Sequence, residues 1–251
     1  MNTSEILKSD KAIFNLLLVK LYTRQLKPGG KLPPLRVFAK ELGVDQASLR
    51  IALKQLEMMG LLDIRRSDGA YIQDFKETGG LDFLTGLFSI EELQENRTIL
   101  DSFLVDEIMA FWAATYPEIM FMASLRFSSL DLKRFLEILD SQIEQIDNIE
   151  KLIELDFFAQ DLVGKLANNL MASLFLNSVR PIIQNMTDVF YRNLSKKSRL
   201  RFLKVKKQGV CRLMNGTLDL RVSTENFRKE MEKCREEIRK SIAESIFDFQ
   251  T

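Results

Sequence analysis

Residues 27–36, KPGGKLPPLR, begin the stretch that decides the fold, which continues through ELGVDQASLR at 41–50 to MGLL at 59–62. The pattern predicts two short helices that meet at Gly43, where glycine accepts a left-handed backbone at no steric cost. The first helix is expected over about 35–42, and Asp45 is a good N-terminal cap for a second over about 46–59. Two short helices joined in this way are typical of a helix-turn-helix.

A β-hairpin is expected directly after the second helix. Gly60 ends that helix, and two short strands over 61–65 and 70–74 flank a turn of sequence SDG at 67–69. A helix-turn-helix followed by such a ribbon is a winged helix-turn-helix, whose second helix enters the major groove of DNA. The sequence therefore predicts double-stranded DNA as a partner.

The second helix has one apolar face and one polar face. The apolar residues recur at helical spacing and would face the core: Leu49, Ala52, Leu53, Leu56 and Met59. Gln46, Arg50 and Lys54 lie four residues apart on the opposite face. Glutamine can bridge N6 and N7 of adenine, and arginine can bind O6 and N7 of guanine or a phosphate. We expect Gln46 and Arg50 to contact DNA, whereas Lys54 taken alone fits an ordinary solvated charge.

Further residues around this helix fit the same docking surface. Ser48 lies near the helix N-terminus, a favourable place for phosphate oxygens, and Arg36 on the preceding helix is a candidate phosphate clamp. Arg65 and Arg66 lie where the wing would approach the minor groove or the backbone. The candidate DNA-binding residues are Arg36, Gln46, Ser48, Arg50, Arg65, Arg66 and Gly69. The alternative is that they are solvated surface residues, but their common surface favours DNA contact.

Charge and composition support a binding protein more than an enzyme. The net charge is only +1, yet residues 1–75 contain 12 Lys+Arg and 8 Asp+Glu, whereas residues 76–251 contain 24 and 27. Positive charge is thus concentrated in the predicted DNA-binding part. The chain has no histidine, which excludes serine-histidine and cysteine-histidine triads and any histidine-ligated metal.

The rest of the chain predicts a second, all-helical domain. The sequence TGG at 78–80 is the best linker, so we expect domains at 1–77 and 78–251. No run of alternating β-branched residues follows, and short connections favour antiparallel neighbours. The predicted fold is mainly α: an N-terminal winged helix-turn-helix with a small β-hairpin wing, followed by an all-α antiparallel helical bundle.

Targeting features are not evident in the sequence. No apolar run approaches the roughly 20 residues that span a bilayer, and the N-terminus does not resemble a signal peptide. The two cysteines indicate neither a disulfide framework nor a zinc site. We therefore expect a cytoplasmic protein with no membrane partner.

A family pattern runs through the first domain. Its segments are PG at 28–29, LPPLR at 32–36, GVDQASLR at 43–50 and GL at 60–61. They resemble the GntR family of bacterial repressors, which shares Pro-Gly, Leu-Pro-x-x-Arg, Gly-Val-Ser-Arg-x-x-x-Arg and Gly-Leu. The resemblance implies a DNA-binding transcriptional repressor. The chain departs from the pattern at Asp45 and Gln46, where the family usually has Ser or Thr and then Arg, so its operator should differ from the family's usual form.

The second domain resembles the FadR branch of that family. Three segments carry the resemblance: FKETGGLD at 75–82, ENRTILD at 95–101 and ELDFFAQ at 154–160. They are similar to that branch's linker, its first bundle helix and its Asp-x-x-x-His motif. The resemblance implies an all-helical domain for effector binding and dimerisation, with Arg97, Asp156 and Gln160 as candidate pocket residues.

The chain departs from the ligand sites of these relatives. In the larger group with this bundle, an aspartate and histidines hold a metal ion. Here Asp156 is present, but Gln160 replaces the first histidine, and Lys206 and Cys234 align with later ones. An ammonium repels a cation and glutamine is a weak ligand, so no metal is expected. The FadR group binds acyl-CoA beside small residues of its last helix, whereas residues 231–238 here are MEKCREEI.

The sequence as a whole predicts a homodimeric transcriptional regulator on a palindromic operator, with one winged helix on each half-site. Acyl-CoA, a fatty acid or another small molecule is the expected class of effector. One alternative keeps the DNA binding and makes the bundle a ligand-free dimerisation body. Two others are an enzyme with a fused DNA-binding head and a structural DNA-bridging protein that lacks sequence preference.

Overall fold

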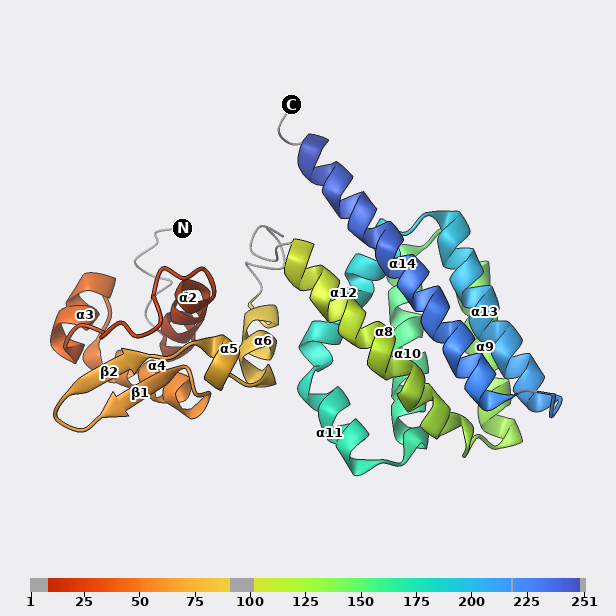
Figure 1. Cartoon of the computed structure of the whole chain (residues 1–251), viewed down its shortest axis with the longest axis horizontal. Coiled ribbons are helices and arrows are strands. Elements are labelled where there is room, and N and C mark those ends of the chain that lie inside the picture. The colour runs from red at the N-terminus through yellow and green to blue at the C-terminus, as the bar shows by residue number, and fades with distance from the viewer. Residues whose placement is uncertain (1–8, 91–101, 218, 249–251) are drawn as a thin grey trace. The chain divides into compact units, whose positions relative to one another are not determined.

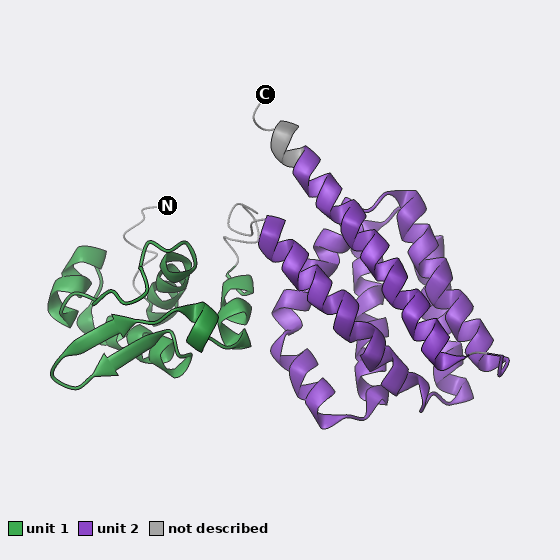
Figure 2. Cartoon of the chain, in the orientation of Figure 1, with its two compact units in different colours: residues 1–99 green, residues 100–251 purple. Residues whose placement is uncertain are grey.

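The computed structural model describes residues 9–90, 102–217 and 219–248 (Figure 1). The chain divides into two compact units, residues 1–99 and 100–251 (Figure 2). In the described ranges, no helix has both the length and the apolar character that crossing a membrane requires.

The first unit is a winged helix-turn-helix (Figure 1). Its described elements are α2 (Asp10–Tyr22), α3 (Leu35–Leu42), α4 (Gln46–Met58), β1 (Leu62–Arg65), β2 (Gly69–Ile72), α5 (Phe75–Thr78) and α6 (Leu81–Phe88). The two strands pair antiparallel, with Leu62 opposite Ile72 and Arg65 opposite Gly69. The predicted helix-turn-helix and wing are therefore confirmed, with strands slightly shorter than expected.

The segment before α3 completes the wing. The Leu32 amide donates to the Ala70 carbonyl at 2.8 Å, and the Ile72 amide donates to the Gly30 carbonyl at 2.8 Å. Lys31 thus forms an antiparallel bridge with Tyr71 on β2. The KPGGKL segment is held against the hairpin by backbone hydrogen bonds.

The turn between α3 and α4 follows from two local residues. Gly43 has a left-handed backbone with φ +68°, and a Cβ there would meet no atom within 4 Å. Conformation and not space therefore calls for glycine at this position. Asp45 caps α4, because its carboxylate accepts hydrogen bonds from the Ala47 and Ser48 amides, both at 2.9 Å.

One apolar core joins the elements of the first unit. Fully buried side chains come from α2, α4 and the residues before β1: Ile13, Leu17, Leu18, Leu49, Ala52, Leu56 and Leu61. Each such leucine or isoleucine contributes about 1.5–3 kcal/mol through burial. This core fixes which face of α4 is turned outward.

The first unit extends beyond residue 77, where the sequence analysis placed the domain boundary. The Thr78 hydroxyl donates to the Gly60 carbonyl at 2.7 Å, and α6 packs against α2. Phe83 and Leu87 of α6 are both buried in the core of the first unit. The TGG sequence therefore connects two short helices that pack with the DNA-binding elements, because α6 has an apolar face that needs a partner.

The described part of the second unit is entirely helical (Figures 1 and 2). Its elements are α8 (Ser102–Ser124), α9 (Ser129–Glu144), α10 (Ile149–Ala167), α11 (Leu170–Ser178), α12 (Arg180–Asn193), α13 (Lys196–Met214) and α14 (Leu220–Asp248). Helix α8 packs against α10 and α14, and α9 packs against α10 and α13. The mainly α fold class is confirmed.

The two prolines of the bundle act differently. Pro181 lies in the first turn of α12, where its missing amide costs no helical bond. Pro117 lies inside α8 and is buried, and the helix continues beyond it to Ser124. Packing of α8 against α10 and α14 offsets the lost hydrogen bond.

The close contact between Gly60 and Thr78 of α5 can be tested by substitution. Gly60 has φ +72°, and a Cβ there would overlap the Thr78 carbonyl oxygen, whereas Gly43 has a similar φ and open space. We expect Gly43→Ala to lower the free energy of unfolding by about 1–2 kcal/mol, the cost of a left-handed alanine. Gly60→Ala should lower it by roughly 3 kcal/mol or more in urea denaturation of the full chain. Equal losses would contradict the contact.

Candidate nucleic-acid interface and ligand pocket

Helix α4 presents the predicted polar face to solvent. Gln46, Arg50 and Lys54 are exposed, while Leu49 and Ala52 are 0% exposed. The apolar stripe of this helix therefore fixes its rotation, and the residues predicted to contact DNA point away from the core.

Four of the predicted DNA-binding side chains have no partner in the described part of the chain. They are Arg36, Gln46, Arg50 and Arg66, all of them exposed. None forms a hydrogen bond or an ion pair with a described residue. Lys54 differs, because its ammonium forms an ion pair with Glu57 one turn further along α4. The contrast agrees with treating Lys54 as an ordinary surface charge, and the DNA contacts of the other four stay predictions.

In the first turn of α4, the backbone amides donate hydrogen bonds to the capping residue Asp45. Hydrogen bonds from the Ser48 side chain and amide, and from the Ala47 amide, lower the pKa of Asp45. The carboxylate is therefore ionised at neutral pH and occupies the amides at the helix N-terminus. A phosphate near Ser48 would compete with Asp45 for these donors, which the sequence analysis did not anticipate.

The wing is fixed by contacts around Tyr71. Asp68 accepts a hydrogen bond from the Tyr71 hydroxyl at 2.9 Å and forms an ion pair with Lys31 at 2.7 Å. These partners, Lys31 first, lower the pKa of Asp68. The Arg65 guanidinium lies 4.4 Å from the Tyr71 ring centroid and donates to Asp63 at 2.8 Å. Arg65 is thus held along the wing, in contrast to the unpaired Arg66.

The geometry of the wing explains why residue 69 is a glycine. Its φ is +135°, and a Cβ there would lie 2.8 Å from Cε of Lys31. Lys31 was not among the predicted site residues, because its contact with Asp68 joins positions 37 residues apart. Only the pairing of residues 29–32 with β2 brings it to the wing.

A buried polar cluster lies inside the bundle, and we call it the Asp156 centre: Asp156, Gln160, Tyr191 and Lys206. The Asp156 carboxylate accepts hydrogen bonds from Gln160 Nε2 at 2.6 Å, Tyr191 OH at 3.1 Å and Lys206 Nζ at 3.1 Å. The side chain of Lys206 is only 2% exposed. The structure therefore brings together Asp156 and Gln160, as predicted, and adds Tyr191 and Lys206. Arg97, the third predicted pocket residue, lies outside the described residues.

The ionisation of this centre follows from its neighbours. Burial alone would raise the pKa of Asp156, but the Lys206 ammonium and the three hydrogen bonds outweigh burial and lower it. Burial and the adjacent carboxylate raise the pKa of Tyr191 well above its usual value. Asp156 is therefore ionised and Tyr191 keeps its proton at neutral pH.

The Asp156 centre does not fit a metal ion. All three groups that face the carboxylate donate hydrogen bonds to it, and one of them, Lys206, is itself a cation. A divalent ion needs electron-pair donors around it and would be repelled by the ammonium. No step of the function is therefore assigned to a metal.

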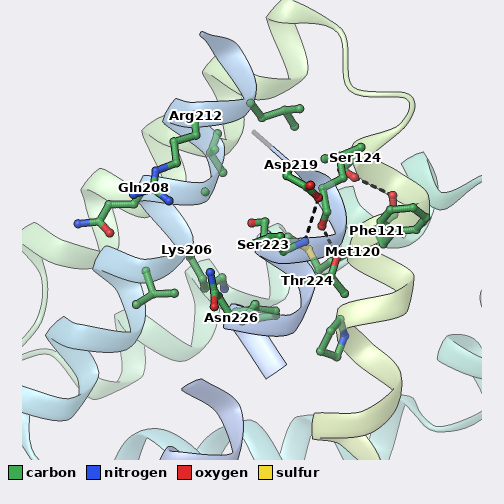
Figure 3. A pocket seen from close by; sticks show the side chains of 18 of the residues that line it. Met120, Phe121, Ser124, Lys206, Gln208, Arg212, Asp219, Ser223, Thr224 and Asn226 are labelled. Atoms are coloured by element: carbon green, nitrogen blue, oxygen red, sulfur yellow. Dashed lines mark hydrogen bonds between the residues drawn. The ribbon is translucent and has the colours of Figure 1, made fainter. Parts of the chain in front are cut away.

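A pocket of about 580 Å³ opens between α8, α13 and α14 (Figure 3). Its wall includes Met120 and Phe121 from α8, Lys206 from α13, and Ser223 and Phe227 from α14. Asp156 and Gln160 are not among its lining residues, so Lys206 alone links the Asp156 centre to this pocket. From its position in the sequence Lys206 was expected only to be a poor metal ligand, because the pocket depends on helices far apart in the chain.

The buried ion pair predicts a specific stability pattern. Asp156→Asn should lower the free energy of unfolding at pH 7 by about 3–5 kcal/mol, because it leaves the Lys206 ammonium buried and unpaired. The double variant Asp156→Asn/Lys206→Met should lose much less. Since the pKa of Asp156 is lowered on folding, this stabilisation is present above the usual carboxyl pKa and is lost as pH falls through the folded value. Additive losses in urea denaturation would contradict the pairing.

The sequence of this chain is similar to known regulators of transcription. Residues 10–72 match the family described as bacterial regulatory proteins, gntR family. The transcriptional regulator Mce2R of Mycobacterium tuberculosis is 28% identical over 182 residues, which cover 70% of this chain and 72% of that protein. The fatty acid metabolism regulator protein of Pasteurella multocida is 27% identical over 180 residues, covering 70% and 68%. The solved structure of Lar from Listeria monocytogenes covers 92% of this chain and 95% of its own, at 18% identity and TM-score 0.48.

These matches confirm the family that the sequence motifs indicated, including the likeness to the fatty acid metabolism regulators. The family and the named relatives are regulators of transcription and not enzymes. Residues 10–72 are therefore a gntR-family helix-turn-helix domain, and over most of its length the chain is similar to named transcriptional regulators.

Proposed function

We propose that this regulator is a cytoplasmic homodimer that represses transcription from a roughly palindromic operator. Each subunit would place α4 in the major groove of one half-site, because two-fold protein symmetry is mirrored in such sites. The observation that carries the proposal is that Gln46 and Arg50 are exposed and have no side-chain partner among the described residues, on a helix whose other face is buried.

Different residues of the first unit would contact the bases and the phosphates of the DNA. Gln46 and Arg50 have the geometry to contact base edges, while Arg36 on α3 and Arg66 on the wing would bind phosphates. Arg65 is held by Tyr71 and Asp63, so it would support the wing and add positive charge. Phosphate contacts would give affinity and register, and the α4 contacts would give sequence preference.

The bundle would carry the control of DNA binding. Its pocket of about 580 Å³ falls within the range of small-molecule sites, about 300–1,000 Å³. Three relatives are named as fatty acid metabolism regulators, which supports a fatty acyl or related effector. An effector would act by favouring a placement of the two winged helices in which both cannot reach their half-sites.

A ligand-free bundle is the second candidate. The hydrogen bonding of Asp156 favours it, because the carboxylate accepts from three protein donors and needs no ligand of its own. Thermal melting against acyl-CoAs, fatty acids and short organic acids separates the two candidates. A shift with one class supports the effector, and no shift with any compound supports a bundle that only dimerises.

Selection of bound DNA from a randomised pool tests the proposed function directly. We expect two enriched inverted half-sites whose centres are about 10 base pairs apart, or a multiple of that spacing, and two chains per DNA by native mass spectrometry. Enrichment of single half-sites bound by one chain would contradict the dimer. Binding without any enriched sequence would instead favour a DNA-bridging protein.

A further inference from the structure

We infer that Lys206 is the resident cation of the bundle pocket and that, without a metal ion, it binds the head group of an amphiphilic carboxylate. The inference rests on the proposed control of the regulator by a small molecule and names the chemistry of that ligand. It follows from the position of Lys206, the charge of the pocket and the apolar part of its wall.

Lys206 belongs to the Asp156 centre and is also one of the residues that line the pocket. Its ammonium donates to Asp156 Oδ1 at 3.1 Å and lies 5.3 Å from the centroid of the Phe202 ring. In the described ranges, Asp156 is its one hydrogen-bond acceptor. A lysine ammonium has three N–H donors, so Asp156 does not use all of them, and Lys206 is one of the residues that line the pocket.

The Asp156 centre takes the place that a bound metal ion would need. Gln160, Tyr191 and Lys206 all donate to the Asp156 carboxylate, which leaves no arrangement of electron pairs for a cation. Asp156 instead holds the ammonium in the core, where an unpaired charge would be costly. A ligand carboxylate would therefore meet an ammonium that is already desolvated and held in position.

The wall of the pocket has more positive than negative charge. Its cationic residues are Lys206, Arg212, Lys229 and Lys233, and its anionic residues are Asp219 and Glu230. Glu230 is engaged by the Arg201 guanidinium at 2.5 Å and by Lys233 at 3.7 Å. The pocket thus favours an anion over a cation.

The rest of the wall suits a hydrocarbon tail. Met120 and Phe121 come from α8 (Figure 3). Phe127 follows α8, and Leu213 and Phe227 come from α13 and α14. Methionine and aromatic side chains adapt to flexible apolar ligands. The fitting ligand is therefore a carboxylate with an apolar chain.

Isothermal titration of the full-length protein with dodecanoate below its micelle concentration, in the presence of EDTA, tests the inference. We expect about one dodecanoate per chain, and at least about tenfold weaker binding of dodecanol, which has the same tail without the charge. Asp156→Asn/Lys206→Met removes the ion pair without leaving a lone charge and should weaken dodecanoate binding at least about tenfold. Lys204→Met should leave the affinity unchanged, because Lys204 lies on the same helix but is exposed and has no side-chain partner among the described residues.

Three outcomes would overturn the inference: equal affinity for dodecanol, unchanged affinity in the double variant, or binding that EDTA abolishes and Zn²⁺ restores. Absence of dodecanoate binding would also overturn it. If the double variant does not fold, the comparison of dodecanoate with dodecanol in EDTA decides alone. Affinity for the selected operator is measured on the same samples. It separates failure of the ligand inference from failure of the proposed DNA-binding function. Dodecanoate binding without any change in operator affinity would refute the proposed control while leaving the pocket chemistry intact.

Discussion

Burial of one face of α4 is the constraint on which the first unit depends. Leu49, Ala52 and Leu56 are almost completely removed from solvent by α2, α3 and the residues before β1, so the helix cannot rotate without losing several kcal/mol of apolar burial. Gln46 and Arg50 consequently face outward. The capping of α4 by Asp45 sets where the helix begins. A helix that is fixed in rotation and in starting point is what base contacts in a groove require.

In the second unit, an electrostatic constraint is added to the apolar one. Asp156 and Lys206 are both buried, and each is tolerated there because the other is present. Gln160 and Tyr191 satisfy further lone pairs of the carboxylate. This arrangement gives the bundle an internal cation, Lys206, which also lines the pocket.

The sequence predicted those features whose causes are local. Gly43 and Asp45 determine the turn and the cap from their own chemistry, and the apolar spacing of α4 gave its buried face. Features that join distant positions were missed: Lys31 reaches the wing across 37 residues, and Lys206 reaches Asp156 across 50. Local propensity disfavours Pro117 inside a helix, yet tertiary packing keeps α8 continuous through it. Local propensity is overridden wherever such packing is strong.

We propose that Arg50 on α4 contacts a base edge in the major groove. Replacing single guanines of the selected operator by 7-deazaguanine removes the N7 acceptor and keeps the base pairing. We predict that one such replacement in each half-site weakens binding of the natural protein. The loss should be part of the about 1–3 kcal/mol that a bidentate contact provides. The same replacement should have no effect on Arg50→Ala and its full effect on Lys54→Ala. Equal losses in the natural protein and in Arg50→Ala, or no loss at any guanine, would contradict the claim.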